Sequence, residues 1–449
     1  MSRKIAFLGG GGIRTPLVAF GINESAKKLD AEELALYDVD AERVEMIARL
    51  CREVVRRDAG SLRITVARTP QEAIDGSSFV LNSVRVGGIA TRAHDERAAI
   101  HCGYPGQETT GPGGVAMGQR TIPIAIEQAR LVERIAPRAW IINFTNPAGL
   151  ITQAIMHHSN ARVVGICDTP TEMLHRIQTA LGASASEVSC DYVGLNHLGW
   201  IRKITLHGQD VTERVLNDDT LLSQLYSAPL FEHDLIRALR LIPTEYLFFY
   251  YSRRRALENQ KRQGSTRGEQ IAEMNESLTQ RLMQLFHQGN EACALQAYVD
   301  YLNQRSGSYM KLEGEGQSAF AQDIPKEDPF RSATGYHRIA LQVMNALCDG
   351  QPNRVIVNVR NGSTLPEISA DDVIEASCSI QDDIIEPLPA APLPDVVRGL
   401  VLAVKAYERA AIEAAVKGSE LELRKAMLLY PSIGEWEPSA DLLKVMRWS

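Results

Sequence analysis

A chain of 449 residues with 45% hydrophobic residues can bury a large core and is too long for one ordinary domain. Its formal net charge of −7 is the opposite of the strongly basic charge typical of nucleic-acid-binding proteins, so no nucleic-acid partner is expected. No apolar run approaches about 20 residues and no signal peptide follows Met1, so no membrane association is expected. Seven cysteines, an odd number without CxxC pairs, favour a reducing cytoplasmic setting.

Six strand-like apolar runs occur in about the first 170 residues, at 4–8, 34–37, 62–66, 79–82, 140–144 and 163–166. Helical patterns lie between most of them, as at 41–57 and 120–136. This alternation is typical of the α/β class, in which helices cover both faces of a parallel sheet. Six strands is also the number in a doubly wound, Rossmann-like dinucleotide-binding domain.

The character of the sequence changes after residue 190. The later segments favour antiparallel strands at 191–216, helices at 235–302 and 337–347, a strand and turn at 354–366, and helices at 396–432. No repeat or low-complexity linker separates these segments from the first part. We therefore expect a dinucleotide-binding domain over 1–190 and a mixed α+β domain over 191–449 that packs continuously on it.

Four glycines follow the first predicted strand in KIAFLGGGGIRTP. Such a loop permits a tight turn and brings backbone N–H groups close to a pyrophosphate at a helix N-terminus. It departs from the GxGxxG pattern because Arg14 stands at the third glycine position, and a glycine-rich turn without a ligand is the alternative. The second strand ends in LYDVD, where Asp38 is suited to accept from a ribose hydroxyl. The expected dinucleotide-binding residues are Gly9, Gly10, Gly11, Gly12, Ile13 and Asp38.

The segment VVGICDTPTEM (163–173) is an apolar strand that continues into a helix. Thr169 is expected to be the N-cap, with Pro170 at the first helical position and Glu172 completing a capping box. Cys167 and Asp168 then lie at the carboxyl end of a strand, where an open α/β sheet binds its ligands.

Cys167 and His197 are 30 positions apart, and each comes just after a strand-like run. A thiolate and an imidazole can hold a divalent transition metal and leave positions open for a substrate. Each residue alone has an ordinary explanation, as a buried packing cysteine or a hydrogen-bonded histidine near Trp200. The polar loops GQETTGPGG (106–114) and NFTNP (143–147) are further candidates for binding groups.

The order of the motifs resembles glycoside hydrolase family 4. The motifs are the glycine loop, YDVD, RxxDE at 92–96, GQETTGPGG, NFTNP, CDTP, GLNHLGW, EYLFFYY and STR, with a looser similarity through NVRNGSTLP. The resemblance implies NAD and a divalent metal, most often Mn²⁺, as cofactors. It also implies a Rossmann-like sheet of the lactate/malate dehydrogenase type and an NAD-dependent exception to two-carboxylate glycoside hydrolysis.

The resemblance assigns roles to residues at matching positions. It implies metal ligands at Cys167 and His197, a general base at Tyr246, a general acid at Asp168, and substrate contacts from Arg92, Asn146 and Arg267. Arg267 is the candidate partner of a substrate phosphate, since an arginine fork binds phosphate in two places. Pro170 resembles the branches of the family that act on phosphorylated sugars.

The implied reaction is hydrolysis of a 6-phospho-glucoside to glucose 6-phosphate and an aglycone. C3 is oxidised by NAD, the C2 proton is removed, the aglycone is eliminated, water adds, and the C3 ketone is reduced again. The loops at 85–97 and 106–114 favour the β anomer slightly, whereas Asp168 is typical of 6-phospho-α-glucosidases, which remain the alternative. A plain NAD-dependent 2-hydroxy-acid dehydrogenase is a further alternative. The expected partners are a small phosphorylated glycoside and further copies of the chain, as a homodimer or homotetramer.

Overall fold

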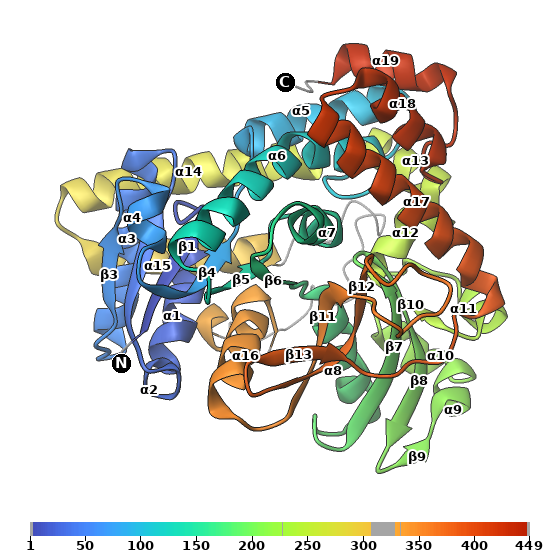
Figure 1. Cartoon of the computed structure of the whole chain (residues 1–449), viewed down its shortest axis with the longest axis horizontal. Helices are drawn as coiled ribbons and strands as arrows, with labels where there is room; N and C mark the ends of the chain where they lie inside the picture. The colour runs from blue at the N-terminus through green and yellow to red at the C-terminus, as the bar shows by residue number, and fades with distance from the viewer. Residues whose placement is uncertain (1–2, 227, 307–327, 333, 447–449) are drawn as a thin grey trace.

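The computed structural model of the protein describes residues 3–226, 228–306, 328–332 and 334–446 (Figure 1). Its first part alternates strands and helices in this order: β1 (Arg3–Leu8), α1 (Thr15–Glu24), α2 (Ala26–Leu29), β2 (Ala31–Tyr37), α3 (Ala41–Arg57), β3 (Arg63–Val66), α4 (Pro70–Ile74), β4 (Ser77–Asn82), α5 (Gly88–His101), α6 (Gly111–Ile135), β5 (Trp140–Asn143), α7 (Ala148–His158), β6 (Arg162–Gly165) and α8 (Thr169–Leu181).

The second part mixes short strands with long helices. Its elements are β7 (Val188–Leu195), β8 (Leu198–Leu206), β9 (Gln209–Asp210), α9 (Thr212–Leu216), α10 (Asp219–Gln224), α11 (His233–Leu239), β10 (Ile242–Pro243), η1 (Glu245–Leu247), α12 (Phe248–Tyr251), α13 (Arg253–Gln263), α14 (Arg267–His287), α15 (Glu291–Ser306), η2 (Pro329–Arg331), α16 (Tyr336–Asp349), β11 (Asn353–Arg360), β12 (Val373–Gln381), β13 (Ile384–Pro387), α17 (Asp395–Lys417), α18 (Glu420–Leu429) and α19 (Glu437–Val445).

The main sheet has nine strands in the order β13-β12-β11-β6-β5-β4-β1-β2-β3. The six N-terminal strands are parallel and follow the order 3-2-1-4-5-6, which is that of a dinucleotide-binding Rossmann fold. The strand order reverses between β1 and β4, so the crevice at the carboxyl ends of these two strands is the expected ligand site. The predicted α/β, doubly wound sheet is thus confirmed.

Three strands from the second part extend this sheet. β11 pairs antiparallel with β6 through Asn358 and Gly165, and β12 and β13 follow as antiparallel neighbours. A separate antiparallel sheet contains β10, β8 and β7, with β9 paired to β8. The second part is therefore mixed α+β, as predicted, and is joined to the first by strand pairing.

Both faces of the main sheet are buried. Alternate residues of β1 point to opposite faces: Ile5 and Phe7 belong to one hydrophobic core, and Ala6 and Leu8 to the other. The first core is covered by α1, α3, α14, α15 and α16, and the second by α6, α7, α8, α17 and α18. Burial on both faces explains the nearly continuous apolar runs in the sequence.

Two of the long helices, α3 and α14, begin at side-chain caps. The Asp40 side chain accepts from the N–H of Arg43 at 3.0 Å and starts α3, whose bounds match the pattern predicted for 41–57. At the start of α14, the side chains of Thr266 and Glu269 form a reciprocal capping box. The helical region predicted over 235–302 is not one rod, because β10 and the short η1 turn interrupt it.

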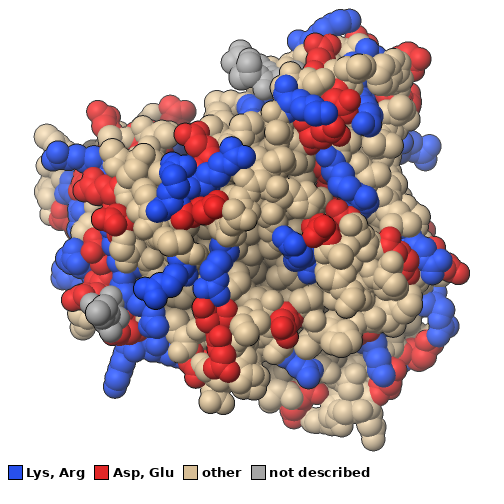
Figure 2. All heavy atoms as spheres, viewed as in Figure 1, with Lys and Arg blue, Asp and Glu red and all other residues tan. Residues whose placement is uncertain are grey.

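Acidic and basic side chains are interspersed over the face shown in Figure 2, without a field of one sign. Within the part of the chain that the structure describes, no helix combines the length and apolar character needed to cross a bilayer. All seven cysteines are free thiols. Figure 1 also shows α17, α18 and α19 together along one edge of the molecule, where α17 packs against α6.

Candidate active site

The glycine loop lies between the ends of β1, β2 and β4. Gly9 has φ +84°, and a Cβ there would lie 2.2 Å from the carbonyl oxygen of Ser83, so only glycine fits this crossing. The N–H of Gly11 donates to Asp38 Oδ2 at 3.0 Å, which joins the loop to the end of β2. The side chain of Ile13 is buried and its carbonyl accepts from the Tyr298 hydroxyl at 2.7 Å, so Ile13 can offer a ligand only its backbone.

Arg14, which replaces the expected third glycine, faces the candidate chemistry. It precedes α1, and its Nη1 lies 3.9 Å from Asp168 Oδ2 at the end of β6. Its guanidinium also lies 5.0 Å from the centre of the Tyr336 ring. Burial raises the pKa of the Asp168 carboxyl, while Arg14 and a hydrogen bond from Tyr336 act in the opposite direction.

The start of α8 differs from the predicted capping box. Asp168, not Thr169, is the N-cap residue, no side chain caps the helix, and Glu172 instead pairs with Arg176 at 2.9 Å. Thr169 does not cap the helix, because its hydroxyl and N–H face the Cys167 sulfur instead. Burial nevertheless raises the pKa of the Cys167 thiol well above its usual value, so a thiolate there needs a cation beside it.

His197 occupies the turn between β7 and β8 with φ +59° and is 4% exposed. Its Nδ1 is 2.8 Å from the hydroxyl of Thr109. Burial lowers the pKa of His197 to about 3, so the ring is neutral and one nitrogen keeps a lone pair. Within the described ranges, the buried Nε2 has no hydrogen-bond partner, an arrangement that suits a metal ligand.

Tyr246 stacks on this imidazole with 3.6 Å between ring centres and 5° between ring planes. It lies on the η1 turn. Burial, with the negative charge of Glu108, raises the pKa of the Tyr246 phenol well above its usual value. Without an additional positive charge, Tyr246 is therefore a very weak base.

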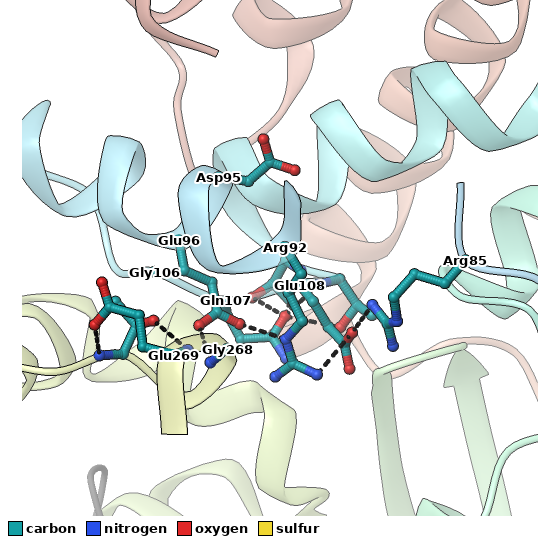
Figure 3. A network of polar contacts seen from close by, with 12 residues as sticks. Arg85, Arg92, Asp95, Glu96, Gly106, Gln107, Glu108, Gly268 and Glu269 are labelled. Carbon is teal, nitrogen blue, oxygen red and sulfur yellow. Dashed lines mark hydrogen bonds and ion pairs between the residues drawn. The ribbon is translucent and has the colours of Figure 1, made fainter. Parts of the chain in front are cut away.

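Figure 3 shows an ion-pair network around Arg92 and Glu108. Both residues are in electrostatic contact with Tyr246. Glu108 accepts from Arg85 Nη1 at 2.5 Å and from Arg92 Nη1 at 2.9 Å, while Arg92 Nε donates to Glu96 at 2.8 Å. Burial opposes the ionised carboxylate, but the two arginines dominate and lower the pKa of Glu108 to about 2. This side of the site therefore remains fully ionised at neutral pH.

Glu96 joins α5 to the start of α14. Its second oxygen accepts from the N–H of Gly268 at 2.6 Å, and Figure 3 shows the two residues facing each other from separate elements. The neighbouring Arg267 donates through Nη2 to the carbonyl of Arg305 at 3.2 Å. The Arg305 guanidinium contacts the Tyr301 hydroxyl at 2.8 Å. Burial, with repulsion from Arg14, lowers the pKa of Arg305 to about 10.

Five of the predicted residues thus converge from distant parts of the chain, namely Arg92, Cys167, Asp168, His197 and Tyr246. Electrostatic contact links Tyr246 to Cys167, Asp168 and Arg92. The loop after β5 carries Asn146, whose buried Oδ1 has no partner in the described part of the chain. The sequence had given no role to Arg14, Glu108, Thr109, Arg305 or Tyr336.

A signal was available for some of the missed residues. Arg14 was visible as the departure from the glycine pattern, and Glu108 and Thr109 belong to the GQETT loop. No such sequence signal marked Arg305. It lies in the last turn of α15, where the sequence does not indicate which side chains Arg305 contacts in the fold.

The residues fit a metal and a dinucleotide. Among residues 3–226, 228–306, 328–332 and 334–446, no three His, Cys, Asp or Glu side chains gather to hold an ion by themselves. A neutral imidazole with an unpartnered nitrogen and a buried thiol are two donors of the type that Mn²⁺ or Zn²⁺ accepts, with the remaining positions left to a substrate. The glycine turn leads directly into the start of α1, and a helix N-terminus in this place suits a pyrophosphate.

Comparison with known families identifies the class of protein. Residues 4–183 match the family 4 glycosyl hydrolase model, and residues 192–433 match the model of the C-terminal domain of the same family. The two matches cover most of the chain. The protein belongs to family 4 of the glycosyl hydrolases, which confirms the predicted family and glycosidase class.

Individual relatives are similar over nearly their whole length. The chain is 29% identical to a probable 6-phospho-β-glucosidase of Bacillus subtilis, covering 96% of this chain and 92% of the relative. It is 24% identical to a 6-phospho-α-glucosidase of Leptotrichia buccalis, covering 99% and 96%. At these identities the relatives do not distinguish the β from the α activity.

Solved structures agree with the fold. The 6-phospho-β-glucosidase of Thermotoga maritima, solved with manganese, NAD⁺ and glucose 6-phosphate, has a TM-score of 0.81 at 25% identity, covering 99% of this chain and 97% of that one. A malate dehydrogenase of Plasmodium falciparum has a TM-score of 0.52 at 13% identity, covering 92% and 99%. The latter likeness shows the fold alone and confirms the predicted dehydrogenase-like sheet.

Proposed function

We propose that the protein hydrolyses 6-phospho-glucosides to glucose 6-phosphate and an aglycone, with NAD and Mn²⁺ as cofactors and the β anomer as the preferred substrate. The observation that carries the proposal is the buried, unpartnered Nε2 of neutral His197, whose ring stacks on Tyr246, a residue in electrostatic contact with the Cys167 thiol. A dehydrogenase of the malate type needs neither a thiol–imidazole pair nor a buried tyrosine there. The Thermotoga relative, which was solved with manganese, NAD⁺ and glucose 6-phosphate, supports the same assignment.

The proposed phosphate site is the group of arginines around Arg305. Arg14, Arg92 and Arg305 raise the positive potential in one region, and burial together with repulsion from Arg14 disfavours the charged form of Arg305. A dianionic phosphate would relieve this repulsion and accept paired hydrogen bonds from planar guanidinium groups. Arg267, which contacts the Arg305 backbone, would complete the site from the start of α14.

Cys167 and His197 would hold Mn²⁺, which when bound supplies positive charge beside the 2- and 3-oxygens of the sugar, while NAD on the glycine loop supplies a hydride acceptor. Asp38, at the end of β2, would accept from a ribose hydroxyl. Tyr246 would remove the C2 proton, because a neighbouring cation counteracts the burial that otherwise keeps its phenol protonated.

Asp168 would donate a proton to the leaving oxygen. Burial keeps more of this carboxyl protonated than in water, which suits a general acid, and Arg14 limits the effect. The unpartnered Oδ1 of Asn146 is suited to accept from a sugar hydroxyl. The division into 1–190 and 191–449 and the homodimer or homotetramer remain predictions.

The test is an assay of both nitrophenyl 6-phosphoglucoside anomers, and of the two unphosphorylated glucosides, with NAD and Mn²⁺. We expect nitrophenol release from the phosphorylated substrates, faster for the β anomer, without net formation of NADH. Net NADH formation would indicate a dehydrogenase. Equal cleavage of unphosphorylated glucosides would contradict the phosphate site, and a faster α anomer would reverse the anomer assignment.

A further inference from the structure

A buried carboxylate lies behind the candidate metal ligands. Glu375, on β12, is 1% exposed and is held by three side chains, two from β7 and the turn that follows it and one from β11. Its Oε2 accepts from the Tyr192 hydroxyl at 2.5 Å, and its Oε1 accepts from Asn196 Nδ2 at 3.1 Å and Asn358 Nδ2 at 3.0 Å. Both oxygens are therefore fully engaged within the protein.

One of these hydrogen bonds reaches the His197 turn. Asn196 directly precedes His197, whose positive φ makes its ring direction depend on the geometry of the turn. The Oδ1 of Asn196 also accepts from the N–H of Gly149, in the first turn of α7, at 3.3 Å. Asn196 is thus fixed from two sides, by Glu375 and by α7.

A second of these hydrogen bonds, from Asn358, reaches β6, the strand that precedes Cys167. Asn358 pairs with Gly165 across β11 and β6, and its Nδ2 also donates to the Gly165 carbonyl at 3.4 Å. A Cβ on Gly165 would lie 2.8 Å from the Cβ of Asn358, so the two strands are packed as closely as a glycine permits. Cys167 follows two residues later, where β6 has ended.

We propose that Glu375 is a positioning residue that fixes the Cys167 and His197 segments relative to each other for metal binding. This inference rests on the proposed function, because it takes Cys167 and His197 as the metal ligands. Glu375 positions the two segments through its hydrogen bonds with Asn196 and Asn358. Partners that orient metal ligands in this way change metal affinity by about 10- to 100-fold when they are removed.

The experiment measures metal binding without turnover. Mn²⁺ affinity is determined from the EPR signal of the free ion, and the thiolate-to-metal absorption of Co²⁺-loaded protein reports whether Cys167 ligates. We expect Glu375→Ala to weaken Mn²⁺ binding by about 10- to 100-fold and to diminish the Co²⁺ absorption. NAD affinity, measured by NADH fluorescence, is expected to stay unchanged because the glycine loop is not involved.

The conservative variant separates position from charge. In Glu375→Gln the amide oxygen still accepts from Asn196 and Asn358, and the Tyr192 hydroxyl can accept from the new NH₂ group. We expect Mn²⁺ affinity within about threefold of the parent protein. An equal loss in Gln and Ala variants would show that the charge acts directly and would overturn the positioning role.

Asp372 offers a matched control. It is also buried beside β12, where Gln153 Nε2 donates to it at 3.1 Å and Arg409 lies 3.4 Å away, but no hydrogen bond among the described residues joins its side chain directly to Asn196 or Asn358. Asp372→Ala is expected to bind Mn²⁺ normally, and an equal loss there would overturn the inference. If Glu375→Ala does not fold, Asn196→Ser breaks the same link from the other end, and unchanged affinity would contradict the inference. A parent protein that binds NADH but no Mn²⁺ would instead refute the proposed function.

Discussion

Replacing Glu108 by glutamine removes the negative charge shared by Arg85 and Arg92. The carboxylate is 13% exposed and accepts from the two guanidinium groups at 2.5 and 2.9 Å. Glutamine has nearly the same volume, so the packing of the loop is retained. Arg92 keeps its bond to Glu96, whereas Arg85 loses its ionic partner.

The size of the effect follows from the pKa of the carboxyl. Although burial opposes ionisation, the arginines lower the pKa of Glu108 from 4.5 to about 2. Since each pH unit corresponds to about 1.36 kcal/mol, the ionised carboxylate contributes about 3 kcal/mol to folding at pH 7. Because the folded pKa is the lower one, this contribution is complete above pH 4.5 and is lost as the pH falls toward 2.

Calorimetry of the parent protein and Glu108→Gln at several pH values between 7 and 3 tests this reasoning. We expect a loss of about 3 kcal/mol at pH 7 and roughly half of that at pH 3. Glu133→Gln is the control, because Glu133 bonds Asn160 at the exposed surface and its replacement should change stability by less than about 0.5 kcal/mol. A loss for Glu108→Gln that does not vary with pH would refute the electrostatic account.

Three further variants test other parts of the site. Cys167→Ser should weaken Mn²⁺ retention and lower activity by orders of magnitude while the protein stays folded, whereas full activity after chelation would exclude this ligand. Arg267→Lys should raise KM for a phosphorylated substrate more than it lowers kcat, and an unchanged KM would argue against a phosphate contact. Gly268→Ala would place a Cβ 2.9 Å from the Cα of Ala93, so we expect a loss of about 1–3 kcal/mol of stability. An unchanged melting temperature of Gly268→Ala would show that α5 and α14 can move apart to admit the added Cβ without a loss of stability.

The fold was predictable where the pattern is local. The six parallel strands and α3 are built from apolar runs whose periods reflect burial, so their positions could be found in the sequence. The addition of β11, β12 and β13 to the same sheet could not, since strand pairing over such a separation leaves no local pattern. The predicted capping box at Thr169 does not form, because the Thr169 hydroxyl interacts with the Cys167 sulfur instead. The local sequence does not show that this sulfur competes for the hydroxyl.

Site residues could be predicted from the sequence only where they belong to a recognisable motif. Cys167 and His197 stood out as residue types suited to metal binding, and the structure places them around Tyr246. Arg305 and Glu375 lie far from these motifs along the chain and meet the site through packing of α15 and β12. Long-range contacts of this kind depend on the whole fold, so one sequence without its structure cannot identify them.

The most direct test of the proposed chemistry follows the C2 proton. We expect turnover of nitrophenyl 6-phospho-β-glucoside in D₂O, with NAD and Mn²⁺, to place deuterium at C2 of the glucose 6-phosphate released. Tyr246→Phe, which removes one oxygen and little volume, should suppress turnover and deuterium incorporation together. Glucose 6-phosphate formed at a normal rate without deuterium at C2 would contradict the account, because direct displacement at C1 never breaks the C2–H bond.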